Sequence, residues 1–345
     1  MSQKPLIMAK DLSVHYMLRG SLIGPTPFVR AVENVNLEIA PGSFFGLVGE
    51  SGSGKTTLGR AMLRAAPISK GDVFFADGEI EYSLKDLGKN ELKDYRKRAQ
   101  LIFQDPYAAL SPRMTVRDII AEPLEVMGLT KSRAETDERV REIAAKCRLN
   151  VEHLRRFPHA FSGGQRQRIS IARALVSGPK FIVADESVAA LDVSIQADVL
   201  NLLKELQSDL GITFLFISHD LSVVAHTCDH VAVMYLGRLV ESAPTRQIFE
   251  APRHPYTKAL FSAIPSLDPD DDNSAQKLEG EIPSPTNQPP GCKFHTRCPY
   301  VVDRCKVEEP VLEHADGSGH DVACHRWVEL MEQHVLERVP SKSKT

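Results

Sequence analysis

Gly49-Glu50-Ser51-Gly52-Ser53-Gly54-Lys55-Thr56 is the stretch that decides the fold of this chain. It follows the pattern G-x-x-x-x-G-K-(S/T), in which backbone N–H groups surround phosphate, the lysine meets the terminal phosphates and the hydroxyl ligates Mg²⁺. The apolar residues 44–48 before it are typical of a buried strand, and residues 57–63 after it of a helix. Because this pattern requires a strand before the loop and a helix after it, we predict a nucleotide site here.

Length and charge limit the class of protein. The chain has 345 residues and a net charge of −3, with a pI near 6.5. This length allows a large core plus an appendage, and the charge gives no electrostatic footprint for nucleic acid. Residues 1–5 lack the apolar run of a signal peptide, and every apolar run is strand-sized. We therefore expect a cytosolic protein that reaches a membrane only through a partner, with cysteines reduced or metal-bound.

The order of the expected elements indicates an α/β protein. Residues 6–48 mix strand-like runs with turns, which predicts an antiparallel β portion, and residues from about 90 to 178 have helical spacing. From residue 180 strands and helices alternate, as in a parallel sheet. The strand-like run 181–184 ends in Asp185 and Glu186. Since strand ends at the carboxyl edge of a parallel sheet face the ligand crevice, Asp185 is expected to hold Mg²⁺ and Glu186 to face the attacking water.

A second motif, Phe161-Ser162-Gly163-Gly164-Gln165, is close to the Leu-Ser-Gly-Gly-Gln signature of ATP-binding cassette (ABC) ATPases. Together with the phosphate loop it makes the chain resemble that family over about residues 6–250. The resemblance implies a P-loop fold with a RecA-like parallel-sheet core, an antiparallel β subdomain and a helical subdomain that carries the signature. It also implies hydrolysis of ATP with Mg²⁺. We predict a cassette over residues 1–265, with its helical subdomain at about 105–178, and a C-terminal extension over 266–345.

The resemblance implies roles for further residues. Gln104 fits the Q-loop glutamine that reaches Mg²⁺ and water, His219 fits the switch histidine, and Asp192 fits the D-loop at the dimer interface. Tyr16 lies where these ATPases stack an aromatic ring on adenine, and His15 is the second choice for that role. The other expected nucleotide contacts come from the phosphate loop and the residue after it: Gly49, Ser51, Gly52, Ser53, Gly54, Lys55, Thr56 and Thr57.

The signature implies a dimer. Ser162, Gly163 and Gly164 precede a helix expected to begin near Gln165, and the exposed N–H groups of a helix N-terminus suit an anion. In ABC ATPases that anion is the γ-phosphate held by the opposing subunit, so two ATP molecules lie between two cassettes. Ser187 departs from the proline that the family usually has after the second acid. Both acids remain, and hydrolysis is still predicted.

The stretches 254–260, 280–285 and 291–299 resemble the tail of ATPase subunits of oligopeptide and dipeptide importers, within the peptide and nickel importer group. This implies a peripheral subunit on the cytoplasmic face of the inner (plasma) membrane that energises the import of peptides or related small solutes. The sequence around Asp192 is similar to the second, F-type, of the two ATPase subunits in such importers. The implied partners are a homologous ATPase, two transmembrane permease subunits and an extracytoplasmic substrate-binding protein, with no nucleic acid.

Four of the six cysteines, Cys292, Cys298, Cys305 and Cys324, are spaced C-x5-C-x6-C-x18-C near the C-terminus. Zinc sites usually contain closer pairs, whereas four thiolates are the usual ligands of a 4Fe–4S iron–sulfur cluster, with which the family is associated. We expect that cluster. Zinc with His295 or His325 as spare ligands, and unligated thiols, are the alternatives, and a disulfide is not expected in the cytosol.

Other classes of ABC protein fit this sequence less well than the importer does. A soluble ABC protein of ribosomes would resemble twin cassettes with an N-terminal cluster domain, and DNA-repair relatives insert long coiled coils, whereas this chain has one cassette and no heptad run. A soluble ABC-type ATPase with a redox-sensing or regulatory iron–sulfur cluster is the remaining alternative, and it can coexist with transport.

Overall fold

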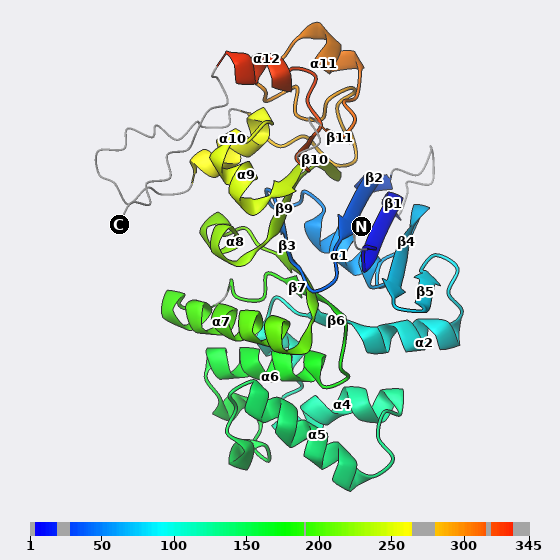
Figure 1. Ribbon diagram of the computed structural model, residues 1–345, viewed down its shortest axis with the longest axis vertical. Coiled ribbons are helices and arrows are strands. Elements are labelled where there is room, and N and C mark those ends of the chain that lie inside the picture. The colour runs from blue at the N-terminus through cyan, green and yellow to red at the C-terminus, as the bar shows by residue number, and fades with distance from the viewer. Residues whose placement is uncertain (1–3, 19–27, 190, 264–279, 315–318, 334–345) are drawn as a thin grey trace.

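The computed structural model describes residues 4–18, 28–189, 191–263, 280–314 and 319–333, which form two sheets with helices around them (Figure 1). The strands are β1 (Ile7–Met17), β2 (Phe28–Ile39), β3 (Phe44–Val48), β4 (Lys70–Asp77), β5 (Ile80–Ser83), β6 (Ala99–Ile102), β7 (Phe181–Asp185), β8 (Thr213–Ile217), β9 (His230–Tyr235), β10 (Arg238–Pro244), β11 (Glu313–His314) and β12 (Asp321–Val322). The helices are α1 (Lys55–Met62), α2 (Lys89–Arg98), α3 (Pro106–Ala109), α4 (Val116–Met127), α5 (Arg133–Lys146), α6 (Gly163–Leu175), α7 (Val193–Leu210), α8 (Leu221–Thr227), α9 (Thr245–Glu250), α10 (Pro255–Ser262), α11 (Asp303–Val307) and α12 (Trp327–Glu332).

The larger sheet contains five parallel strands in the order β9, β3, β8, β7, β6. Strands β3, β7 and β8 are buried at every residue, as expected for parallel strands covered on both faces. Ile217 of β8 is in register with both Leu47 of β3 and Asp185 of β7, so the three strands end level with one another. The sheet therefore brings the phosphate loop and the paired acids to the same edge.

The smaller sheet is antiparallel, in the order β2, β1, β4, β5. Its buried side chains, including Leu12 and Val35, share one apolar cluster with Leu58 of α1 and Leu215 of β8. Helix α1 thus contributes to the contact between the two sheets. The predicted combination of a parallel core and an antiparallel β portion is confirmed.

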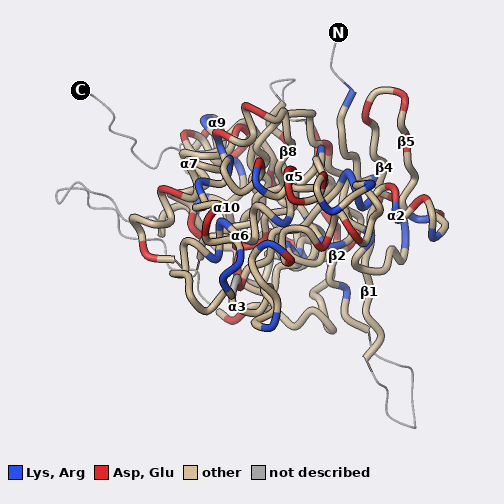
Figure 2. Tube along the Cα trace, turned by 90° about the horizontal axis from the view of Figure 1, so that it is seen from below, with Lys and Arg blue, Asp and Glu red and all other residues tan. Residues whose placement is uncertain are grey.

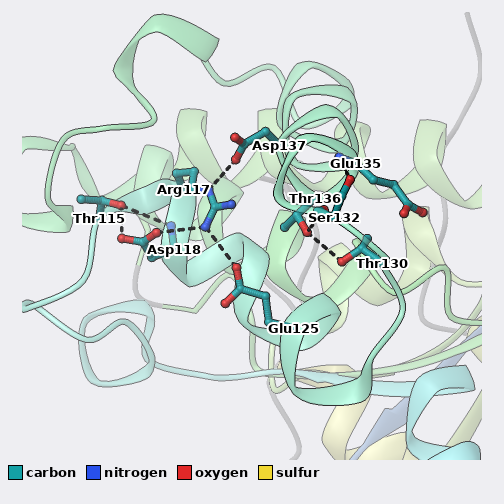
Figure 3. A network of polar contacts seen from close by, with 9 residues as sticks. All are labelled: Thr115, Arg117, Asp118, Glu125, Thr130, Ser132, Glu135, Thr136 and Asp137. Atoms are coloured by element: carbon teal, nitrogen blue, oxygen red, sulfur yellow. Dashed lines mark hydrogen bonds and ion pairs between the residues drawn. The ribbon is translucent and has the colours of Figure 1, made fainter.

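Helices α4, α5 and α6 form the lower part of the molecule in Figure 1. The side chain of Thr115 accepts a hydrogen bond from an N–H of the first turn of α4, and Ser132 does the same for α5. Figure 3 shows how Arg117 of α4 joins the two helices: its Nε donates to Asp137 Oδ1 of α5 at 2.7 Å, and its Nη1 donates to Glu125 Oε1 at 3.1 Å. The contact with Asp137 therefore links α4 to α5, while the contact with Glu125 lies within α4.

The C-terminal residues pack directly on the rest of the chain. Strand β12 pairs with β10 and so extends the larger sheet, and the ring of Phe294 is buried in the same apolar cluster as the central strands. Glu241 of β10 is fully buried and accepts hydrogen bonds from the N–H of His254 and from His320 Nε2, at 3.0 and 2.6 Å. Residues 280–314 and 319–333 are therefore held by strand pairing, apolar contact and a buried polar network.

Two details differ from the sequence-based expectation. Residues 90–178 are not helical throughout, because β6 lies among them and pairs with β7. A four-residue strand that directly follows helix α2 leaves too short a run for its alternation to be recognised. The signature helix α6 begins at Gly163 and not near Gln165, because Ser162 is already its cap. The division at residue 265 stays a prediction, since 264–279 lie outside the described residues.

In Figure 2 basic and acidic residues are interspersed along the trace. In the described part of the chain, no helix combines the length and the apolar character needed to cross a bilayer.

Candidate active site

The phosphate loop has a backbone that depends on glycine at two positions. Gly49 and Gly54 have φ angles of 147° and 106°. A Cβ atom at Gly49 would lie 2.1 Å from the carbonyl oxygen of Met234, and one at Gly54 would lie 2.2 Å from that of Ala31. Both positions therefore exclude other residues by conformation and by space.

Lys55 begins helix α1 with its side chain folded back over the loop. Its Nζ donates to the carbonyl oxygens of Gly49 and Glu50 at 2.8 and 2.9 Å. Burial lowers the pKa of Lys55, against the opposing effect of the carboxylates of Glu186, Asp185 and Glu50. Among the described residues, this nearly buried ammonium is bound only by neutral oxygens, so an anionic phosphate would be a stronger partner for it.

Thr56 and Asp185 meet across the sheet edge. Thr56 Oγ1 donates to Asp185 Oδ1 at 2.9 Å, and Asp185 is buried. Burial raises the pKa of Asp185, while the hydrogen bond from Thr56 and the nearby Arg60 oppose the rise. A hydroxyl and a carboxylate oxygen are the donors that Mg²⁺ prefers, so the donor chemistry fits the predicted metal position.

Glu186 lies between two of the residues predicted to act with it. Its Oε2 accepts a hydrogen bond from Gln104 Nε2 at 2.7 Å, and its Oε1 lies 3.6 Å from Nδ1 of His219. Glu186 has a φ of 46°, in the left-handed region, which turns it away from the direction of β7. The next side chain, Ser187, is buried, and its hydroxyl has no partner among the described residues.

The signature forms the N-terminus of α6 with reciprocal capping. The N–H of Gln165 donates to Ser162 Oγ at 3.4 Å, and the N–H of Ser162 donates to Gln165 Oε1 at 3.0 Å. Gly164 is packed against Ile195, whose Cγ2 would lie 2.4 Å from an added Cβ. Helix α6 lies well away from α1 in Figure 1, as expected if the signature faces the site of another subunit.

The remaining predicted contacts lie where the sequence indicated. Tyr16 in β1 is 38% exposed, whereas His15 is bound through Nε2 to Glu33 at 2.7 Å, which favours Tyr16 as the ring free to stack. Asp192 is exposed before α7. The other loop positions named from the sequence lie in the loop or in the first turn of α1: Ser51, Gly52, Ser53 and Thr57. Their contacts with nucleotide stay predictions.

The four C-terminal cysteines line one small apolar cavity, together with residues that include Phe294 and three histidines. Burial raises the pKa of Cys292 and Cys298 to about 11 and that of Cys324 to about 12. Across the described residues, however, no three or more His, Cys, Asp or Glu side chains are grouped so that they could hold a metal ion. The cluster and the zinc alternative both stay predictions.

Sequence reasoning missed one contact of the phosphate loop. Arg297, between two of these cysteines in the sequence, binds the carboxylate of Glu50 with Nη1 and Nη2 at 2.7 and 3.1 Å. The backbone N–H of Glu50 donates to the hydroxyl of Tyr256 at 2.9 Å. Both residues lie in stretches that resemble importer ATPases, but sequence spacing alone gives no sign that they reach the loop.

Two family models match the chain: "ABC transporter" over residues 32–189, and "Oligopeptide/dipeptide transporter, C-terminal region" over residues 240–305. The dipeptide transport ATP-binding protein DppF of Escherichia coli is 46% identical over 93% of this chain and 94% of its own length. The di/tripeptide transport ATP-binding protein DppF of Pseudomonas aeruginosa is 44% identical over 93% of this chain and 97% of its own length.

Among solved structures, the ATP-binding cassette MJ0796, in a dimeric post-hydrolysis state with ADP and phosphate, matches with a TM-score of 0.60 and 28% identity. The match covers 70% of this chain and 99% of that one. The similarity to that cassette therefore covers most of this chain, and the similarity to the two peptide-transport proteins nearly all of it.

Proposed function

Because this chain belongs to the ATP-binding proteins of ABC transporters and hydrolyses ATP, we propose that it energises the import of peptides through a membrane permease. The observation that carries the proposal is the C-terminal region of oligopeptide/dipeptide transporters, matched over residues 240–305, whose residues pack on the cassette. Relatives named for dipeptide and di/tripeptide transport share nearly the whole chain with it, which supports small peptides as the solute class.

We assign the steps of hydrolysis to the residues gathered at the sheet edge. Lys55 and the N–H groups of its loop bind and neutralise the phosphates, and Glu186 accepts a proton from the attacking water. Gln104 and His219, which lie against the two oxygens of Glu186, orient that carboxylate and the water. Mg²⁺, when bound by Thr56, Asp185 and Gln104, supplies further charge neutralisation.

A second cassette completes each site in this proposal. The N-terminus of α6, with the exposed Ser162, presents N–H groups suited to the γ-phosphate of ATP on the partner. The dimeric state of the cassette MJ0796 supports such pairing. We propose a homologous F-type partner ATPase, two permease subunits and an extracytoplasmic binding protein. The chain would then lie on the cytoplasmic face of the inner membrane.

The four cysteines are proposed to hold a 4Fe–4S cluster. The support is their donor chemistry: four thiols from separate segments line one apolar cavity, and four thiolates are the usual ligands of such a cluster. Histidines also line the cavity, His295 among them, which keeps zinc as the competing occupant.

Purification of the tagged chain from membranes tests the proposed function. Integral membrane proteins that co-purify with it, reconstituted in vesicles with a binding protein, should take up labelled di- and tripeptides only when ATP is supplied on the cassette side. The Glu186→Gln variant is the matched control and should assemble without uptake. A chain recovered without any integral membrane protein would contradict the proposal.

A further inference from the structure

Glu50, the second residue of the phosphate loop, is held at three points. Its carbonyl oxygen accepts from Lys55 Nζ at 2.9 Å, and its N–H donates to the hydroxyl of Tyr256 at 2.9 Å. Its carboxylate is bound by both Nη atoms of Arg297. Two of the three partners therefore come from the C-terminal part of the chain.

The side chain of Arg297 is nearly buried and lies beside an aromatic ring. Its side chain is 5% exposed, and its guanidinium lies 5.9 Å from the centre of the Tyr235 ring. The rings of Tyr235 and Tyr256 pack against each other and against Phe294, at centroid distances of 4.7 and 5.4 Å. A guanidinium enclosed in this way and bound at both Nη atoms has a fixed direction, unlike an ion pair at the surface.

The charge of Glu50 poses a problem for a loop that binds phosphate. The carboxylate is 24% exposed, and it is close enough to Lys55 to act on the pKa of the ammonium. An uncompensated carboxylate here would repel the anionic nucleotide and could turn toward Lys55, competing with phosphate for the same ammonium. Pairing with Arg297 offsets that charge and engages both carboxylate oxygens, whereas Lys55 Nζ donates only to the backbone oxygen of Glu50.

We propose that Arg297 is a positioning residue for nucleotide binding, which keeps the Glu50 carboxylate neutralised so that the loop and Lys55 are free for phosphate. The C-terminal region would then serve the nucleotide site directly as well as carrying the cysteines. This inference rests on the assignment of the loop as the nucleotide site.

Two roles of the Arg297–Glu50 pair, mechanical support of the loop and neutralisation of charge, predict different effects of substitution. If the pair only braces the loop, removing either partner should weaken nucleotide binding to the same extent. If Arg297 neutralises Glu50, the two substitutions differ in sign: Arg297→Gln leaves an unpaired carboxylate, whereas Glu50→Gln leaves an unpaired cation beside the phosphates.

The test is calorimetric titration of MgADP into the full-length chain. Arg297→Gln should raise the Kd about tenfold, Glu50→Gln should leave it unchanged or lower it, and the double variant, in which neither charge remains, should bind like the wild type. Arg297→Lys, which keeps the charge but loses the two-point contact, should recover most of the affinity. Arg304→Gln is the matched control, because Arg304 forms an exposed pair with Glu308 in the same region.

In the assembled transporter, Arg297→Gln should raise the KM for ATP and leave kcat within about twofold, since Glu186 and its partners are untouched. The inference is overturned if Arg297→Gln binds MgADP like the wild type, or if Glu50→Gln weakens binding as much as Arg297→Gln does. Should Arg297→Gln not fold, Glu50→Gln alone decides, because weakened binding there contradicts the neutralisation. A wild-type chain that does not bind MgADP would instead refute the assignment of the loop.

Discussion

Gln104 donates a hydrogen bond from Nε2 to Oε2 of Glu186 at 2.7 Å, across 82 positions of sequence. Gln104 lies between β6 and α3, the first of the helices α3 to α6, whereas Glu186 directly follows β7 of the larger sheet. The hydrogen bond therefore joins the helical part of the cassette to the sheet at the predicted catalytic base. His219 approaches the other oxygen from the end of β8. Any movement of the helical part against the sheet would therefore alter the surroundings of Glu186.

Glu186→Gln should retain nucleotide binding and lower ATP turnover by the assembled complex about 10²-fold or more, the scale of a general-base contribution. The amide can still meet Gln104, while Lys55 and Asp185 are unchanged, so the loss should fall on the chemical step. Steady-state hydrolysis and MgATP binding check both parts. Glu205→Gln, at an exposed pair with Arg148, is the control and should hydrolyse normally. Near wild-type turnover by Glu186→Gln would remove this residue from the role of base.

Asp185→Asn should stabilise the protein in the absence of nucleotide and abolish its Mg²⁺-dependent turnover. Burial raises the pKa of Asp185, so the ionised carboxylate costs stability. Because the pKa of Asp185 is higher in the folded than in the unfolded state, the protonated carboxyl does not lower the free energy of unfolding at a pH below the unfolded pKa. As the pH rises through the folded pKa the carboxyl ionises in its buried position, so the loss of stability is complete at neutral pH. Thermal unfolding at pH 7 should show a higher Tm for the variant. The difference between variant and wild type should shrink at acidic pH.

The nucleotide motifs could be predicted from sequence because each one is local. The phosphate loop needs glycine at Gly49 and Gly54 for backbone reasons that any sequence with this loop must meet. Asp185 and Glu186 follow a buried strand, and the rule for parallel sheets places such residues at the ligand edge. Neither feature depends on which distant segments of the chain pack together.

The contact of Arg297 with Glu50 could not be predicted in that way. The two residues are 247 positions apart, and their pairing depends on how the C-terminal region folds back onto the loop. Strand β6 was missed for a related reason, because its identity comes from pairing with β7 and not from its own four residues. Long-range packing decides both, and periodicity in one stretch of sequence does not encode it.

Ser162→Arg should abolish turnover at the partner's composite site without weakening nucleotide binding to this chain's own loop. The bulky side chain would stand at the N-terminus of α6, where the γ-phosphate of the partner is expected. Gly164→Asp is unsuitable for this purpose, because its Cβ would lie 2.4 Å from Ile195 and would disturb the packing of α6.

The matched control for Ser162→Arg is Ser162→Ala, which removes the cap, at a cost of about 1 kcal/mol, but leaves the space open. Mixing each variant with the wild-type partner and measuring turnover and affinity separates the two effects. Equal turnover by the two variants, or loss of this chain's own nucleotide affinity in Ser162→Arg, would contradict the half-site assignment.

Alanine at any one of Cys292, Cys298, Cys305 and Cys324 should remove most of the iron from protein purified without oxygen, which should be brown with about four irons per chain. Cys147→Ala and Cys228→Ala are the controls, because both thiols are buried in the core of the cassette, away from the cavity. The raised pKa values of Cys292, Cys298 and Cys324 mean that these thiols are protonated at neutral pH, so cluster assembly must release protons and should be favoured as pH rises. Colourless protein with one zinc per chain would overturn the cluster, while the importer assignment, which rests on the flanking sequence, would stand.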